Sequence, residues 1–531
     1  MKRIKKKLFT IFLLFYFLIG SYNSLNTGIS FDERYEELNW KFNVSLIKDI
    51  SNNFNKKKKF DREKFDAKVK NFVGYGIGFQ LISQPIQFFV KKLPILKNNL
   101  DNFGAKLVAK HLVVFLFFFV SGIFFYLILK KIINNENFCI IGSIVYLTYP
   151  YLFGQAMFSP KDVPFMSVWL MCTYLSFTLF ESLIKENKIN LYHLLFFSFM
   201  TAYLLSVRIA GILIFIQYLI LLMLFIGIYK NNFIKLFKKF YLKFLFFLSS
   251  IILFTFLFNP FFWIDPFLLI ETIKINTNHF NNVGTTTFGR IMYAKDLPST
   301  YLPIWLAVKI PFLILLGIII LPITEKKIFE HKKKSIFFGN ILLTIIAIIF
   351  LLIFNRVHLY DEIRQVMFLV PLIFIIGLVS LYLFSKKLFY FTGVLSIIFF
   401  ITENVKINPY QYVWFNLPSR YVDLTKKFEL EYQGISGREI AKQISKLDYQ
   451  NTCILVNPIH SVEPFLDKSK FNCFDIWQKV DTDYKRPFLA VQNVRNLKKS
   501  MPYNCVSVYE THFKLFFQKE KFVTGKLLSC S

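Results

Sequence analysis

The sequence predicts an α-helical membrane protein with about eleven spans and a small C-terminal α/β domain. Composition is the first indication, because 55% of the 531 residues are hydrophobic and only 18% are charged, against about 25% charged in soluble domains. The second is that apolar residues form blocks of about 17 to 22, enough for a helix to cross a bilayer core roughly 30 Å thick. The third is a soluble-type composition after residue 403.

The first span is expected at about 8–20, after the basic segment Met1–Lys7. A signal peptide is the alternative, but no small-x-small cleavage site follows the apolar run. The other ten spans are expected near 107–129, 138–158, 163–184, 189–207, 209–229, 243–263, 301–322, 336–355, 367–385 and 388–403.

Lysine clusters in the short loops predict the orientation. With the N-terminus in the cytoplasm, the clusters at 130–131, 185–188, 235–239, 326–334 and 386–387 all lie inside. Short outer loops carry almost none, as the positive-inside rule requires. The sequence therefore predicts a multi-pass membrane protein whose N-terminus is cytoplasmic and whose C-terminal domain is extracytoplasmic. Because the net charge of +31 gathers in these loops, where anionic lipids attract it, we expect membrane lipids and no nucleic acid as partners.

Two outer regions follow from this topology. Residues 1–403 form the membrane domain, whose long first outer loop (21–106) includes an amphipathic stretch, 69–90, expected to lie at the interface. Residues 404–531 form the extracytoplasmic α/β domain, with a helix at 436–447 and strands at 452–456, 488–491 and 505–509. Four cysteines there (Cys453, Cys473, Cys505, Cys530) allow two disulfides in three connectivities.

Charged residues cluster at the predicted outer ends of the spans, where each is a functional candidate. The candidates are Asp32, Glu33, Lys161, Asp162, Arg208, His358, Tyr360 and Arg364. A carboxylate can remove a proton from an incoming hydroxyl, and arginines can hold a phosphate and stabilise it as it leaves. A site at the membrane surface suits a donor whose lipid tail stays in the bilayer. These residues predict group transfer from a lipid-linked phosphate.

At these positions the sequence resembles the polytopic GT-C glycosyltransferases, particularly the protein O-mannosyltransferase-like branch. The resemblance rests on short motifs from residue 31 to about 445 that occur in the family's order. They are Phe31-Asp32-Glu33, Ser159-Pro160-Lys161-Asp162, Val207-Arg208, Tyr360-Asp361-Glu362-Ile363-Arg364, and Asn408-Pro409-Tyr410-Gln411-Tyr412.

The resemblance implies a polyprenyl-phosphate-sugar donor and an inverting single displacement on the periplasmic side of the bacterial cytoplasmic (inner) membrane. It implies that Asp32 is the general base and Glu33 a contact to the acceptor. Lys161 and Asp162 would line the site, and Arg208 and Arg364 would bind the donor phosphate. No cofactor or metal is expected, although some GT-C enzymes use a divalent ion. The acceptor is left open between lipid, glycan and protein.

Simpler interpretations stay open for these residues. Lys161 and Asp162 are also typical of a solvated turn with an ion pair, and His358 of a structural residue. Tyr410, Tyr412 and Trp414 are also typical of an interfacial aromatic belt. Asp32 and Glu33 are also typical of the first turn of an interfacial helix, where the helix dipole favours acids. Arg208 is also typical of a side chain reaching from a span end to the headgroups, and Arg364 of a local partner for Asp361 or Glu362. For the whole chain, the alternatives are a transporter or flippase of lipid-linked or polysaccharide substrates, and an O-antigen ligase or polymerase.

Overall fold

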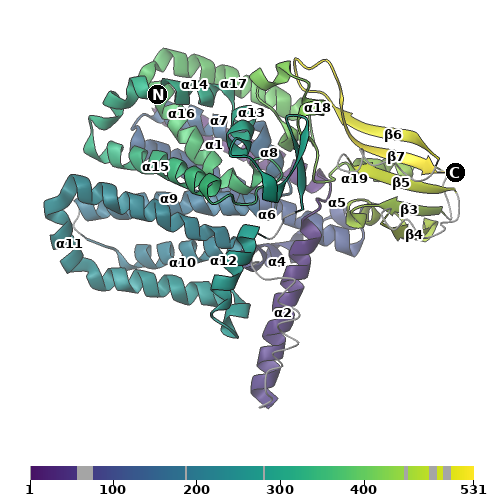
Figure 1. Ribbon diagram of the computed structural model, residues 1–531, viewed down its shortest axis with the longest axis horizontal. Coiled ribbons are helices and arrows are strands. Elements are labelled where there is room, and N and C mark those ends of the chain that lie inside the picture. The colour runs from purple at the N-terminus through teal and green to yellow at the C-terminus, as the bar shows by residue number, and fades with distance from the viewer. Residues whose placement is uncertain are drawn as a thin grey trace.

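A computed structural model describes residues 2–56, 76–185, 188–278, 282–447, 452–476, 487–493 and 504–530. Its helices in chain order are α1 (Lys2–Asn26), α2 (Glu33–Lys56), α4 (Gly78–Val90), α5 (Pro94–Lys97), α6 (Asn102–Ile132), α7 (Glu136–Thr148), α8 (Pro150–Gln155), α9 (Asp162–Lys185), α10 (Leu191–Val207), α11 (Ile214–Phe258), α12 (Leu268–Asn278), α13 (Tyr301–Lys309), α14 (Phe312–Phe329), α15 (Lys332–Phe354), α16 (Val370–Phe384), α17 (Lys386–Lys406), α18 (Leu424–Lys427) and α19 (Gly437–Ile444). The strands are β1 (Gly284–Thr287), β2 (Arg290–Tyr293), β3 (Thr452–Val456), β4 (Phe471–Asp475), β5 (Phe488–Asn493), β6 (Cys505–Phe513) and β7 (Phe522–Cys530). A helix bundle forms one end of the molecule and a sheet the other (Figure 1).

The chain is an α-helical polytopic membrane protein. Among the described residues, eight helices are long and apolar enough to cross a membrane, or nine if one bent pair is a single span. That pair is Tyr301–Lys309 with Phe312–Ile328, bent by 116°, where Pro311 cannot continue the preceding helix. Two shorter apolar helices, α7 and α10, lie where spans were expected. The total of about eleven spans stays a prediction.

Close approach of backbones holds part of the bundle together. A Cβ atom added at Gly317 on α14 would lie 2.0 Å from the carbonyl oxygen of Gly377 on α16. Only glycine permits this separation, and small residues at such crossings are the usual means of tight packing between helices in lipid. The two helices therefore meet without intervening side chains.

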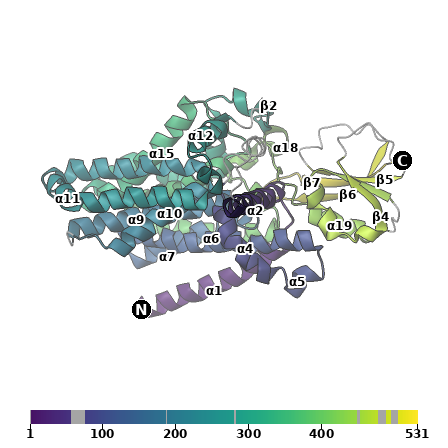
Figure 2. The ribbon, with the colours of Figure 1, turned by 90° about the horizontal axis from the view of Figure 1, so that it is seen from below.

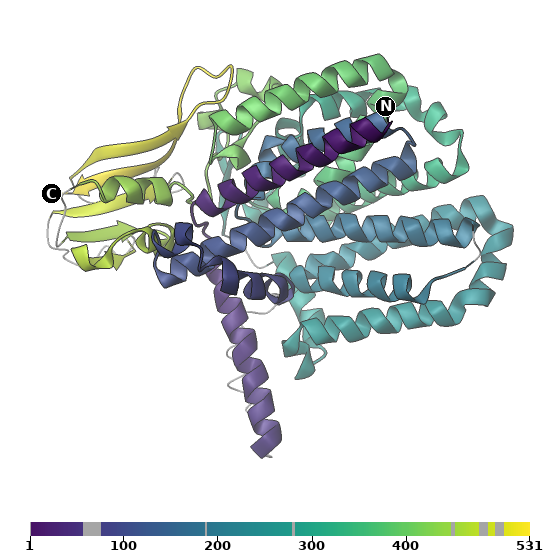
Figure 3. The same cartoon turned by 180° about the vertical axis from the view of Figure 1, so that it is seen from behind.

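Helices α2 and α4 occupy the expected first outer loop. In Figures 1 and 3, α2 runs across the direction of the spans and projects away from the bundle. Its apolar residues Phe42 and Leu46 pack against Phe261 and Phe262 at the end of α11. Helix α4 accounts for the amphipathic stretch from residue 78 onward, while 69–75 lie outside the described residues. An interfacial position for the amphipathic stretch stays a prediction.

The C-terminal sheet has the strand order β4-β3-β5-β7-β6. Strands β4, β3 and β5 are parallel, and β7 pairs antiparallel with β5 and β6. The expected strands correspond to β3, β5 and β6, and the expected helix to α19, which is shorter than predicted. Sequence analysis missed β4 and β7. A small α/β domain is thus present, while its boundary at residue 403 stays a prediction.

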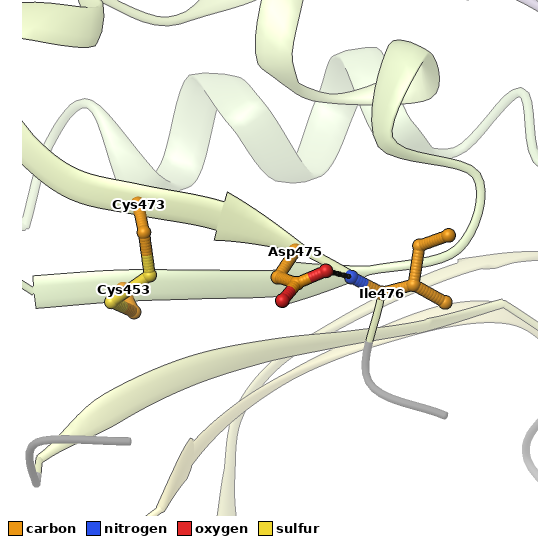
Figure 4. The surroundings of a disulfide bond; sticks show 4 residues. All are labelled: Cys453, Cys473, Asp475 and Ile476. Carbon is orange, nitrogen blue, oxygen red and sulfur yellow. Dashed lines mark hydrogen bonds between the residues drawn. A yellow bond between two sulfur atoms is a disulfide. The ribbon is translucent and has the colours of Figure 1, made fainter. Parts of the chain in front are cut away.

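Disulfides select one of the three possible connectivities. Within the described chain, Cys453 pairs with Cys473 and Cys505 with Cys530. Figure 4 shows the first of them joining the neighbouring strands β3 and β4. The second joins β6 to β7 at a directly paired position. Each bond therefore ties two adjacent strands of the sheet.

The segment between the last span and the sheet packs with the spans. Tyr410, Tyr412 and Trp414 are buried in the same apolar cluster as the bundle helices. A belt of interfacial aromatics would face lipid headgroups, so these rings are core residues instead. The segment anchors the C-terminal α/β domain, called the outer domain after the side predicted for it, to the end of the bundle that carries the candidate site.

Candidate functional site

The site begins at the turn that joins α1 to α2. Backbone N–H groups of Tyr35 and Glu36 donate to the Asp32 carbonyl oxygen, 3.1 and 3.3 Å away, which starts α2. The Asp32 carboxylate lies beside this first turn, where the helix dipole favours a negative charge. Its side chain is 35% exposed. Asp32 is therefore both fixed in position and open to the surface.

Arg364 brings distant parts of the chain together at Asp32. One terminal nitrogen of its guanidinium lies 2.8 Å from Asp32 Oδ2 and 3.6 Å from Asp361 Oδ2. Its Nε lies 3.3 Å from Asp162 Oδ2. Three carboxylates thus share one arginine, whose planar fork can serve several acceptors at once. Only 6% of the Arg364 side chain is exposed.

Asp162 links the two arginines of the site. Its Oδ1 pairs with Arg208, and its Oδ2 accepts a hydrogen bond from Ser159 at 3.2 Å. Asp162 is the first residue of α9, and Arg208 immediately follows α10. The α9 and α10 ends that face the outer domain therefore meet through this pair.

Lys161 forms a second branch of the network. Its Nζ lies 2.7 Å from Glu36 Oε1. Deeper in, Lys110 Nζ contacts Glu37 Oε2 at 2.6 Å and Gln80 Oε1 at 2.8 Å. Acids three and four residues after Glu33 face the bundle because residues at this spacing share one side of a helix. The first turns of α2 thus dock through charge as well as apolar packing.

Glu33 lies away from the opening. Its side chain is 4% exposed; Oε1 accepts from the Ser30 N–H at 2.6 Å, and Oε2 lies 2.8 Å from His111 Nε2. His111 Nδ1 in turn lies 3.0 Å from the Ser24 carbonyl oxygen. A carboxylate bound on both oxygens and enclosed in this way holds the α1–α2 turn. The expected contact of Glu33 with the acceptor stays a prediction, and in this structure both carboxylate oxygens are held within the protein.

Of the remaining candidates, Tyr360 joins the network and His358 does not share its ion pairs. The Arg364 guanidinium lies 5.7 Å from the centre of the Tyr360 ring. Tyr360 is buried, and this burial raises the pKa of its hydroxyl. His358 Nδ1 is buried without a hydrogen-bond partner among the described residues. Ion pairs therefore join Asp32, Asp162, Arg208 and Arg364, with Tyr360 beside them. Glu33 and Lys161 have other partners, and His358 shares none of these ion pairs.

Sequence analysis missed a buried ion pair beneath the site. Lys309 Nζ lies 2.9 Å from Glu362 Oε1, and both side chains are fully enclosed. The ammonium group is also 4.1 Å from the centre of the Phe415 ring. Burial raises the pKa of Glu362 to about 8, although Lys309 opposes the shift. Lys309 lies within the expected span 301–322, where a charge is a signal, but its partner could not be identified without the fold.

The backbone before Arg364 is held in an unusual conformation. Asp361 and Glu362 have φ values of 55° and 66°, in the left-handed region that disfavours residues with a Cβ. Each such residue costs on the order of 1–3 kcal/mol and persists where surrounding contacts enforce it. Here Glu362 is paired with Lys309, and the Asp361 N–H donates to Thr285 Oγ1 at 3.3 Å. The turn therefore places Asp361, Glu362 and Arg364 close together at this end of the bundle.

The outer domain holds the turn that carries Asp32. Arg438 on α19 donates to the carbonyl oxygens of Leu25 and Thr27 at 2.9 and 3.1 Å. The Phe31 N–H donates to the Gln433 carbonyl oxygen at 2.9 Å. A Cβ added at Gly28 would lie 2.1 Å from the backbone oxygen of Ile435. The turn is therefore fixed from outside as well as from the bundle.

Groups of three or more His, Cys, Asp or Glu able to hold a metal ion do not occur among the described residues. The acids of the site face lysines and arginines rather than one another. Metal independence remains a prediction from the sequence.

The fold and site define a multi-pass membrane protein with a network of acids and arginines at one end of its spans. Neither a family model nor a curated protein sequence matches the chain. A crystal structure of ArnT from Cupriavidus metallidurans bound to undecaprenyl phosphate is similar, with 12% identity, a TM-score of 0.45, and coverage of 98% of this chain and 97% of that one. The apo state of ArnT shows 11% identity, a TM-score of 0.42, and coverage of 86% and 93%. At these values the likeness carries no argument about ligand or activity.

Proposed function

We propose that the chain is a membrane glycosyltransferase of the GT-C type that takes its sugar from a polyprenyl-phosphate donor. One observation carries the proposal: Asp32, Asp162, Arg208 and Arg364 form a continuous ion-paired network at one end of the spans. These residues come from parts of the chain up to 332 positions apart. Charges at membrane depth are costly, and a converging set of this kind is typical of a functional site.

Exposure separates the roles of the cations. Arg208 and Lys161 are 23% and 18% exposed, whereas Arg364 is 6% exposed and surrounded by carboxylates. A donor phosphate can reach the first two and exchange with their present partners. We therefore assign the phosphate to Arg208 and Lys161, and we assign Arg364 to positioning Asp32. This revises the sequence expectation that Arg364 binds the phosphate.

Asp32 has the exposure and position of a general base. Its Oδ2 lies 2.8 Å from the Arg364 guanidinium, and 35% of the side chain is exposed, so an acceptor hydroxyl can reach the carboxylate. In the proposed step an acceptor oxygen forms a bond to the anomeric carbon as the bond from that carbon to the phosphate oxygen breaks. The acceptor proton passes to Asp32, and the electron pair leaves with the polyprenyl phosphate. Attack from the face opposite the phosphate inverts the anomeric centre.

The position of the network suits a lipid-linked donor. Asp162 begins α9 and Arg208 follows α10, so both lie where the apolar helices end. A polyprenyl tail can stay in the bilayer while its phosphate reaches these groups. Lysine-rich ends lie at the opposite end of the bundle, where Lys5 contacts Asn137 and Lys131 contacts Glu181. By the positive-inside rule we place those ends in the cytoplasm and Asp32 at the periplasmic face.

A transporter or flippase is the second candidate, favoured by the bent pair α13–α14. Its break follows Lys309, whose ion pair with Glu362 is fully buried. Broken helices and buried charges near a substrate path are typical of secondary transporters. Such a protein would move a lipid-linked sugar without forming a covalent product.

The two candidates are separated by assaying the reconstituted protein. Proteoliposomes receive radiolabelled polyprenyl-phosphate sugars, tested one at a time, with envelope extract as acceptor. We expect label to move from the donor to a covalent product, and Arg208→Ala to lower the rate at least tenfold. Arg290→Ala, which removes an exposed arginine on β2, is the matched control. Movement of intact donor across the bilayer with no covalent product would establish the transporter instead.

A further inference from the structure

A basic cavity lies at the end of the bundle opposite Asp32. Its volume is about 450 Å³, within the range of small-molecule sites, and its lining comes from the ends of α6, α9 and α15. Four lysines line it (Lys130, Lys131, Lys333, Lys334) against a single acid, Glu181. The lining of the cavity therefore carries a net charge of about +3 from these five side chains.

Glu181 organises two of the four lysines. Its Oε2 lies 2.7 Å from Lys131 Nζ, and its Oε1 pairs with Lys333. Lys131 also lies 5.0 Å from the centre of the Tyr174 ring. Lys130 and Lys334 form no ion pair with any described residue. Two lysines of the cavity are therefore held in place by Glu181, and the other two can bind an additional anion.

The first turn of α15 gives an independent indication of that anion. Lys332, Lys333 and Lys334 open this helix, and no side chain caps its free N–H groups. The positive end of a helix dipole disfavours lysines and favours anions. Lysines at the end of α6 are explained by the opposite dipole, but those of α15 are not. An anion in the cavity would offset both the lysine charges and the uncapped helix end.

Depth in the membrane indicates which anion fits. Asp162 and Glu181 lie on α9, and 19 residues of helix rise about 28 Å, close to the thickness of a bilayer core. Glu181 is therefore at headgroup level on the other face. Leu127 and Tyr174, which also line the cavity, lie one to two turns deeper toward the apolar centre. The cavity therefore has lysines at headgroup level and apolar side chains deeper in the bilayer, which matches the charged head and apolar chains of a lipid.

We propose that this cavity binds the headgroup of an anionic phospholipid, with its phosphates held by the lysines and its first methylenes against Leu127 and Tyr174. The excess of three charges suits a headgroup with two phosphates better than one with a single phosphate. Basic pockets between spans on the cytoplasmic side are known sites for such headgroups. This site is separate from the Asp32 network and does not depend on the proposed transfer reaction.

The test uses the full-length protein in detergent after removal of bound lipid. Binding of diphosphatidylglycerol, phosphatidylglycerol, phosphatidylcholine and inorganic pyrophosphate is compared by native mass spectrometry and thermal shift. We expect diphosphatidylglycerol to bind tightest and to raise the unfolding temperature. The double variant Lys130→Gln/Lys334→Gln should weaken its binding at least tenfold, since neither lysine is needed for an internal ion pair.

A matched control removes two lysines on the same face but outside the cavity. Lys386→Gln/Lys387→Gln, at the exposed start of α17, has the same charge change. We expect it to bind diphosphatidylglycerol as the wild type does. Equal losses in both double variants would overturn the proposal in favour of general attraction to a basic surface. Pyrophosphate binding as tight as the lipid's would overturn the lipid assignment and leave a site for free phosphate.

Discussion

Arg364 is the residue on which the electrostatics of the site depend. It is buried against Asp32, Asp162 and Asp361, so its removal leaves three carboxylates facing one another. Breaking a buried ion pair by removing one partner costs about 3–5 kcal/mol. We expect Arg364→Met to lower the free energy of unfolding by about this amount, measured by chemical denaturation in detergent.

Arg364→Lys separates charge from geometry. Lysine keeps one positive charge but lacks the planar fork that serves several carboxylates. We expect it to recover most of the stability and little of the transfer rate. Arg290→Met, a loss of an exposed arginine, is the control for charge alone. Wild-type stability in Arg364→Met would contradict the network.

Glu362 makes stability depend on pH. Its pKa is raised from the ordinary 4.5 to about 8, chiefly by burial, while Lys309 acts against the shift. Between these values the folded protein holds a proton that the unfolded chain has lost, so stability falls as pH rises through this window. We expect the drop in unfolding temperature from pH 6 to pH 9 to be smaller in Glu362→Gln than in the wild type.

The control for this pH dependence is Glu520→Gln, at an exposed position. It should lose stability over the same interval as the wild type does. Identical pH profiles for the wild type and Glu362→Gln would show that Glu362 keeps an ordinary pKa in the folded protein.

Helix α19 acts on the site at a distance. Arg438 holds the carbonyl oxygens of Leu25 and Thr27, just before the turn that carries Asp32. We expect Arg438→Ala to lower the transfer rate about tenfold or more, because small displacements of a catalytic group are costly. Binding of polyprenyl phosphate should change little. Lys442→Ala, an exposed substitution on the same helix, should leave both measurements unchanged, and equal effects of the two would contradict the clamp.

Helices and strands were predictable from the sequence where a local run of apolar residues is enough to determine them. Apolar blocks predicted the long helices, and the runs at 452–456 and 488–491 predicted β3 and β5. Strand β7 was missed because Phe522–Cys530 mixes polar and small residues, and its place depends on pairing with both β5 and β6. The bend between α13 and α14 follows from Ile310-Pro311, since Pro311 cannot continue the preceding helix.

At the scale of the whole molecule, the sequence could predict which residues belong to the site better than it could predict what each residue does there. Span ends placed Asp32, Asp162, Arg208 and Arg364 on one face, and the structure joins them directly. Their pairings could not be predicted, since contacts between residues 46 to 332 positions apart depend on the packing of the whole bundle. Lys110 and His111, charges within an expected span, were a signal that could have revealed the partners of Glu37 and Glu33.

The arrangement of the whole chain puts its two polar regions at opposite ends of one bundle. Figure 2 shows the N-terminal end of α1 far from the C-terminal sheet, while the other end of α1 leads toward it. The Asp32 network lies between the spans and the outer domain, and the lysine-lined cavity lies at the other end. A reaction at one membrane face and lipid binding at the other are compatible with this shape.

The central claim is that Asp32 accepts the proton of the acceptor, and the most direct measurement is single-turnover sugar transfer by Asp32→Asn. This change keeps the size of the side chain and removes its basicity. We expect polyprenyl phosphate to bind with a Kd within about twofold of the wild type, while transfer slows by about 10²–10⁴, the usual contribution of a general base. Asp423→Asn, in the outer domain, should transfer at the wild-type rate. Wild-type transfer by Asp32→Asn would contradict the account.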